Sequence, residues 1–209
     1  LLVNFHPGTN FHVEEYLEKN GMETILPRIT YQFRKDFQAA NSEIRDFGAH
    51  LAPYSFALDA AVEGIQRYLE RIAAAHPLYH KAPRPQDLYA GVSSIIPKTL
   101  TCGEGWLMAG EIAHYAAEGA RSFIILQPFG CLPNHVCGRG VTKRLKELYP
   151  GVQILPLDLD PDTSYANVEN RLQMLIMNQT AEQEKLEPAE APERRTHRGS
   201  YHRPRLSST

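Results

Sequence analysis

The chain has 209 residues, a formal net charge of −2 and 43% hydrophobic residues, enough for one globular domain with a real core. The near-neutral charge excludes a global basic field for nucleic acid, and no apolar run reaches the roughly 18 residues that a membrane span needs. The 3 cysteines argue against a disulfide framework and for a reducing compartment, so we expect a cytoplasmic protein.

The N-terminal pattern is typical of a strand, a helix and a second strand. Short apolar runs at residues 1–5 and 22–26 flank helical spacing at residues 11–20, for which Asn10 is the expected N-cap. This order predicts a parallel strand pair joined by a right-handed crossover, although the unit has no Gly-rich dinucleotide fingerprint. Because the chain opens without Met in what looks like a strand, we expect it to be cut from a longer protein.

Two longer helical patterns follow, at about residues 31–47 and 55–75, and they predict an inserted helical pair. Three prolines within residues 76–85 then mark the return to the sheet. The apolar positions of the second helix are Ala57, Ala60, Ala61, Ile65, Tyr68, Leu69 and Ile72.

The remaining pattern alternates helices with strands, which indicates the α/β class. Thr101 and Glu104 have the spacing of a capping box before the first of these helices. The expected elements are a helix at 104–118, a strand at 122–127, a helix at 138–149, a strand at 152–157 and a helix at 164–178. We therefore expect a Rossmann-like domain over residues 1–178, with an open, mainly parallel sheet and flanking helices.

The apolar pattern disappears from about residue 179, where Glu and Pro and then Arg and His dominate. Such a composition cannot bury enough apolar surface to order the chain, so residues 179–209 are expected to form a disordered tail. The basic cluster at residues 194–198 stands beside an acidic stretch, and a solvated tail explains it better than nucleic-acid binding does.

Cys131 is the first candidate for chemistry, because a Gly- and Pro-bounded loop places it between an expected buried strand and an expected helix. In open α/β sheets ligands bind at this end of a strand. The competing interpretation is an inert, packed thiol. A zinc site with Cys102, His135 and Cys137 matches no structural zinc spacing. A catalytic pair of Cys131 with His135 or His114 lacks an identifiable third group.

Three segments together carry a family resemblance. They are Cys-Gly-Glu-Gly-Trp-Leu at 102–107, Gln-Pro-Phe-Gly-Cys-Leu-Pro-Asn-His at 127–135, and Pro-Leu-Asp-Leu-Asp-Pro at 156–161 followed by Asn-Val-Glu-Asn-Arg at 167–171. In this order and spacing they resemble the C-terminal domain of the 2-hydroxyacyl-CoA dehydratase component family. The resemblance is greatest to the large activase-related proteins, in which an ASKHA-type ATPase activator is joined to dehydratase-like domains. It covers about residues 1–178 and includes the N-terminal stretch 3–21.

The resemblance implies an oxygen-sensitive iron–sulfur protein of anaerobic metabolism that takes low-potential electrons from an ATP-driven activator and acts on an acyl-CoA, in the dehydratases through ketyl-radical chemistry. It implies that Cys131 is one thiolate ligand of a [4Fe–4S] or double-cubane cluster shared with upstream domains, and that ATP enters only through the activator. The cofactor loop would comprise Gly130, Cys131 and Pro133 together with Gly103 and Glu104. Neither nucleic acid nor a membrane is an expected partner, and an oligomer is compatible with the family.

The form Gly103-Glu104-Gly105-Trp106 and the turn His6-Pro7-Gly8 depart from the dehydratase subunits proper, which leaves the substrate open. Two other functions stay open beside electron transfer. The first is a non-catalytic docking or structural domain of the activase-related assembly. The second is a stand-alone cysteine hydrolase, which would turn over without iron.

Overall fold

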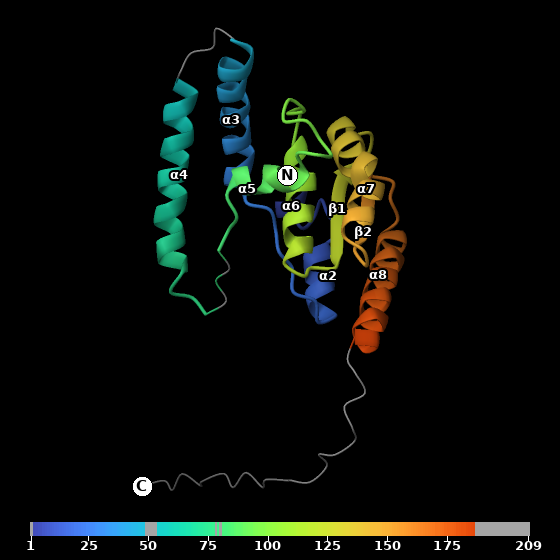
Figure 1. Ribbon diagram of the computed structural model, residues 1–209. Coiled ribbons are helices and arrows are strands. Elements are labelled where there is room, and N and C mark those ends of the chain that lie inside the picture. The colour runs from blue at the N-terminus through green and yellow to red at the C-terminus, as the bar shows by residue number, and fades with distance from the viewer. Residues whose placement is uncertain (1, 49–53, 78, 80, 187–209) are drawn as a thin grey trace, which may run out of the picture.

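The computed structural model describes residues 2–48, 54–77, 79 and 81–186. An α/β body stands beside a hairpin of two long helices, α3 and α4, and α3 lies between α4 and the body (Figure 1). The helices are α1 (Leu2–Phe5), α2 (Val13–Lys19), α3 (Ile29–Phe47), α4 (Tyr54–Ala73), α5 (Pro85–Val92), α6 (Trp106–Ala117), α7 (Thr142–Leu148) and α8 (Tyr165–Leu186). The strands are β1 (Ser122–Pro128) and β2 (Gln153–Leu159).

The two strands pair in parallel, with Ser122 opposite Gln153 and Pro128 opposite Leu159. Successive side chains alternate between two cores because a strand has a period of two. Ile125 and Ile154 belong to the core beneath α5, α6 and α7, whereas Leu157 belongs to the core formed with α2 and α8. Helices therefore cover both faces of the sheet, as a parallel sheet requires, and the predicted α/β class is confirmed.

The predicted first strand is wrong, because residues Leu2–Phe5 form the short helix α1. Asn10 is not the N-cap of α2 either. Its side-chain amide donates to the Val3 carbonyl over 2.9 Å and so ties α1 to the turn that follows. His12, in the left-handed region at φ 56°, is the N-cap residue and makes no side-chain capping bond. A five-residue apolar run is short enough to fit either a strand or a helical turn, and here the Asn10 contact accompanies the helical turn.

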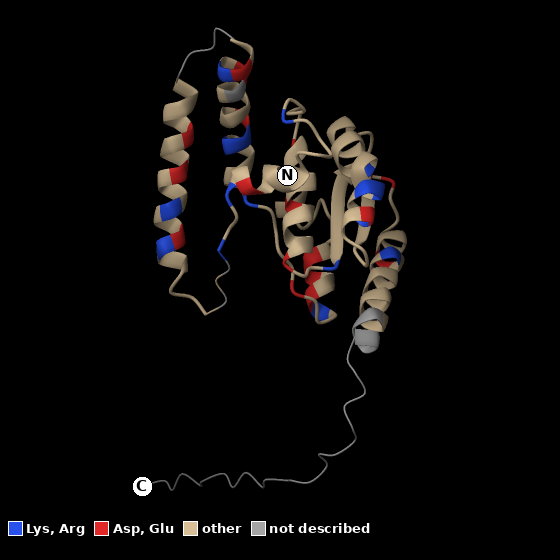
Figure 2. Ribbon diagram, viewed as in Figure 1, with Lys and Arg blue, Asp and Glu red and all other residues tan. Residues whose placement is uncertain are grey.

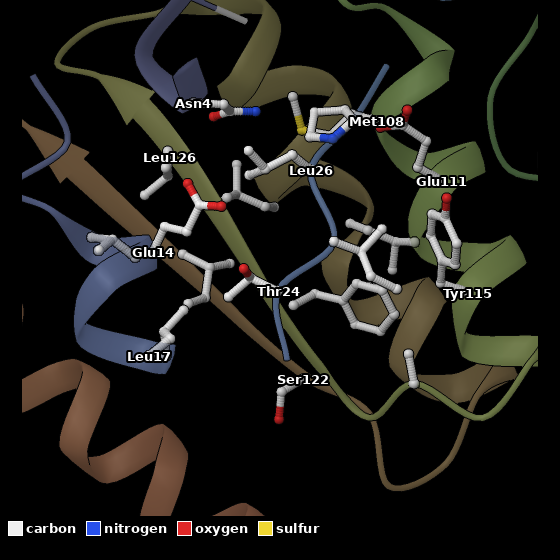
Figure 3. A pocket seen from close by; sticks show the side chains of 18 of the residues that line it. Asn4, Glu14, Leu17, Thr24, Leu26, Met108, Glu111, Tyr115, Ser122 and Leu126 are labelled. Carbon is white, nitrogen blue, oxygen red and sulfur yellow. The ribbon is translucent and has the colours of Figure 1, made fainter. Parts of the chain in front are cut away.

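The predicted second strand is also wrong, since residues 22–28 have no regular structure. The Met22 N–H closes the end of α2 by donating to the Leu17 carbonyl. Beyond it the segment runs extended beside β1 (Figure 3), but within the described part of the chain no backbone hydrogen bond joins the two. Pro27 has no N–H to contribute to a ladder, and a cavity separates the segment from β1. The described sheet therefore consists of β1 and β2.

The predicted helical pair is observed as α3 and α4, and polar groups join the two helices. The Arg34 guanidinium pairs with Asp59 at 2.7 Å and with Glu63 at 3.1 Å. Both helices carry acidic and basic residues along their length (Figure 2). On another side α3 is attached to the body, where the Tyr31 hydroxyl donates to the Pro83 carbonyl over 2.6 Å.

Three predicted boundaries need correction. The capping box is absent, because residues 101–105 form a turn and α6 begins at Trp106 with Gly105 as its N-cap residue, at φ 54°. The helix expected at 138–149 begins earlier, as a π-helical turn at Asn134–Gly138 and a 3₁₀ turn at Arg139–Val141 that lead into α7. Helix α8 continues to Leu186, so the first part of the expected tail is helical, and residues 187–209 lie outside the described residues.

None of the described helices is both long enough and apolar enough to cross a lipid bilayer.

Candidate functional site at the carboxyl ends of the strands

The loop that follows β1 is held by its own backbone. Gly130 adopts the left-handed region at φ 72°, which allows the chain to turn sharply after the strand. The Cys131 N–H donates to the Pro128 carbonyl, and the Cys131 carbonyl accepts from the His135 N–H, each over 3.1 Å. The His135 ring nitrogen Nδ1 also lies 2.8 Å from that carbonyl, and it carries the proton because a carbonyl can only accept. Cys131 is half-buried in this loop.

A second loop, residues 101–105, packs against the first. Gly103 has φ 60°, and a Cβ built there would lie 2.7 Å from Cγ of Pro133, so only glycine fits this contact. The two loops thus contain all five expected cofactor residues: Gly103 and Glu104 on one, and Gly130, Cys131 and Pro133 on the other. Gly103 and Pro133 are in contact, whereas Glu104 lines the cavity described below.

Lys35, a residue that we did not predict, anchors this second loop from α3. Its side chain is fully buried, and Nζ donates to the Thr101 carbonyl over 2.6 Å and to the Gly103 carbonyl. An ion pair with Asp36 at 2.9 Å compensates the buried charge. The signal was available, since Lys35 follows the buried Tyr31 by one helical turn and must share its face.

The three cysteines differ in environment: Cys102 is exposed, Cys131 is half-buried and Cys137 is buried. Burial raises the pKa of the Cys137 thiol, and the charge of a Cys102 thiolate would raise it further. Within the described ranges no three His, Cys, Asp or Glu side chains are placed to hold a metal ion together. The four-residue zinc site is therefore not assembled.

The chain does not bring His114 to Cys131. His114 pairs with Glu118 at 3.2 Å near the end of α6, which leads into the start of β1, whereas Cys131 follows the far end of that strand. A catalytic pair of these two residues is incompatible with this arrangement.

A polar cluster that we did not predict lies beside the Cys131 loop. Gln127 and Asp158 are opposite each other at the ends of β1 and β2, and the Asp158 carboxylate accepts from the Gln127 amide and from the Arg139 guanidinium. Partial burial favours a higher pKa for Asp158, but these two hydrogen bonds and the Arg139 charge lower it below its ordinary value. Neighbouring polar residues at the ends of two expected parallel strands were the signal that could have revealed it.

Two polar atoms of this cluster have no hydrogen-bond partner in the part of the chain that the structure describes. They are Oε1 of Gln127 and Nε of Arg139, and both are buried. A buried polar atom without a partner is costly, so the cluster retains one acceptor and one donor for a further polar group.

A cavity of about 270 Å³ lies between α6, β1 and the extended segment 22–28 (Figure 3). Most of its wall is apolar, and Glu104 and Asn134 place it next to the two loops. Glu111 projects from α6 one turn before Tyr115, and its Oε1 is buried with no partner among the described residues. Burial, with a smaller contribution from the charge of Glu104, raises the pKa of Glu111 to about 8. The cavity therefore contains a carboxyl group that is mostly protonated at neutral pH.

No model of a known protein family matches this chain, and neither the curated proteins nor the solved structures include a significant match.

Proposed function

We propose that this chain is the C-terminal, Rossmann-like domain of an iron–sulfur 2-hydroxyacyl-CoA dehydratase or reductase-like protein, and that Cys131 is its one ligand to a cluster shared with other domains. The observation that carries the proposal is the position of Cys131. It is a partly accessible thiol on a backbone-braced loop at the carboxyl end of a parallel strand.

The surroundings of Cys131 suit a site that another protein surface completes. Phe129 and Leu132, on either side of it, are 74% and 68% exposed, and Val136 is exposed as well. Exposed apolar side chains gathered around one loop favour contact with a partner. A cluster that is shared between domains needs only one thiolate ligand from this domain, and the apolar rim would contact the domain that completes the site.

The residues around Cys131 fit this role. Cys131 would hold one iron, Gly130 supplies the turn that presents it, and the contact of Pro133 with Gly103 fixes the loop from behind. When bound, the cluster supplies a low-potential electron to the acyl-CoA substrate. The unpartnered donor of Arg139 and acceptor of Gln127 lie in the same region and offer hydrogen bonds to a polar group there.

The wider assembly is part of the same proposal. In it an ASKHA-type ATPase, fused or separate, delivers the electrons in the cytoplasm and is the point at which ATP enters. β1 and β2 belong to a larger, mainly parallel sheet. The parallel pairing of β1 with β2 and the helices on both of their faces are what such an architecture requires of this part of the sheet.

A docking domain without catalysis is the second candidate function. The apolar rim formed by Phe129, Leu132 and Val136 favours it equally, because such a rim would contact a partner whether or not Cys131 binds iron. Only the chemistry at the thiol separates the two functions.

The test is the iron and acid-labile sulfide content of the whole protein that contains this domain, purified anaerobically as wild type, Cys131→Ser and Cys102→Ser. Cys102 is the matched control, since it is an exposed thiol on the adjoining loop. The proposal predicts a loss of iron and sulfide in Cys131→Ser alone. Equal content in all three proteins would reject Cys131 as a ligand and leave the docking function.

A further inference from the structure

The α3/α4 hairpin is polar where its helices meet, and it is apolar on a surface that none of the described residues covers. Between the helices lie buried polar side chains, among them Arg34, Asn41, Ser55 and Gln66. Ser55 donates to Asn41 over 2.5 Å, and Arg34 is paired as described above. A helix normally buries its apolar stripe, so an arrangement with polar groups inside indicates that the apolar stripes have another partner.

Each helix carries one such stripe, with the spacings of three and four residues that are typical of helical bundles. The stripe of α3 is Ile29, Phe33, Phe37, Ala40, Ile44 and Phe47. The stripe of α4 is Tyr54, Leu58, Ala61, Ile65, Tyr68 and Ile72, with Leu69 beside it. Nine of these side chains are large and between 41% and 69% exposed: Ile29, Phe33, Phe47, Tyr54, Leu58, Ile65, Tyr68, Leu69 and Ile72.

The two stripes lie on the same side of the hairpin. Successive residues of a helix are rotated by about 100°, so each stripe is turned by roughly 100 to 130° from the residues that face the other helix. The rotation from the contact residues to the stripe has the same direction along the sequence in both helices. Because the helices are antiparallel, a rotation of the same direction places both stripes on one face of the hairpin. Tyr31 and Lys35, which contact the body, lie on the other side of α3. The apolar face is therefore directed away from the body.

We propose that this face is the interface between two copies of the chain, which join their hairpins into a four-helix bundle. Nine large side chains that each offer about 100 Å² amount to roughly 900 Å² per copy, and a stable interface needs about 800 Å² from each partner. Two antiparallel helices with apolar stripes on one face are half of such a bundle, and an identical hairpin supplies the other half.

The charges beside the stripes favour one of the two-fold arrangements. Asp36 and Glu43 flank the α3 stripe on its edge away from α4, whereas the outer edge of α4 carries Ala57, Gly64 and the basic Arg71. A two-fold axis parallel to the helices places α3 of one copy over α4 of the other, so the acidic edge meets an edge that carries Arg71 and no acidic residue at these positions. An axis perpendicular to the helices would bring the acidic edges of both copies together, which like-charge repulsion disfavours.

The test is the mass in solution of the full chain, measured by size-exclusion chromatography with light scattering over a range of micromolar concentrations. One chain is 23.6 kDa, so a dimer is expected at twice that mass. Ile65→Glu and Phe33→Glu, one on each stripe, should raise the dimer dissociation constant at least tenfold. Both side chains are exposed in the single chain, so its circular dichroism should not change.

Phe56→Glu is the matched control. Phe56 is 48% exposed on α4 but lies outside the stripe, so this variant should remain a dimer. A wild-type chain that is monomeric at every concentration would overturn the proposal and leave the face to a different protein. A dimer that survives both stripe substitutions, or that is lost equally in Phe56→Glu, would overturn it as well.

Discussion

Two carboxyl groups show how strongly local surroundings decide the charge of a residue in this fold. Glu111 lies in a mostly apolar cavity with no partner for Oε1 among the described residues, and its pKa rises to about 8. Asp158 accepts hydrogen bonds from Gln127 and Arg139, and its pKa falls below the ordinary value. Both are side chains of the same chemical type, so their neighbours cause the difference.

Glu111 makes the free energy of unfolding depend on pH. Its pKa is higher in the folded than in the unfolded chain, so the folded protein holds the proton between about pH 4.5 and 8 while the unfolded chain releases it. Stability should therefore fall as pH rises through this window, by at most about 1.4 kcal/mol per pH unit. Glu111→Gln should remove this decline, as urea unfolding at pH 5 and pH 8 would show. Parallel pH profiles for variant and wild type would contradict the burial of the carboxyl group.

Asp158 should have the opposite effect. The pKa of Asp158 is lower in the folded than in the unfolded chain. Its contribution to the free energy of unfolding is therefore fully present above the ordinary pKa, and it is lost as the pH falls from the ordinary pKa to the lowered pKa. Asp158→Asn should cost about 1–2 kcal/mol at pH 7, because hydrogen bonds to a charged group are lost. The difference from wild type should shrink below about pH 4. A cost that is independent of pH in denaturant titrations would refute the charged interaction.

At the scale of elements, the long helical patterns and the two later strand runs predicted the structure well, and the two short runs near the N-terminus did not. The apolar spacing of α3, α4 and α6 and the buried runs of β1 and β2 led to the right element in each case. The five-residue runs at 1–5 and 22–26 did not, because so few positions cannot distinguish a strand from a turn of helix or an extended segment. The sequence could have indicated the helix face of Lys35 and the strand-end position of Asp158, but not their partners, because Thr101 and Arg139 lie on other segments of the chain.

The contact between the two loops can be tested with a matched pair of glycines. Gly103 and Gly130 both have positive φ, so alanine at either position should cost about 1–2 kcal/mol. At Gly103 the new Cβ would also lie 2.7 Å from Pro133, whereas at Gly130 it meets nothing within 4 Å. Gly103→Ala should therefore lower the unfolding temperature more than Gly130→Ala. Equal losses would mean that the loops do not pack in this way.

At the scale of the whole molecule, two exposed apolar regions lie on different parts of the fold. One is the face of the α3/α4 hairpin, and the other is the rim of Phe129, Leu132 and Val136 around Cys131. Their separation permits the hairpin to join two copies while the carboxyl end of the sheet stays open to another domain. The oligomer and the cluster are consequently independent, and either proposal can fail without the other.

The central claim is that Cys131 binds iron, and the most direct measurement is the EPR spectrum of the reduced, anaerobically purified protein that contains this domain. We predict that Cys131→Ser abolishes the cluster signal or shifts its g-values, because an oxygen ligand replaces a thiolate. Cys102→Ser should leave the spectrum unchanged. Identical spectra for wild type and Cys131→Ser, or a protein with no cluster in either form, would contradict the account.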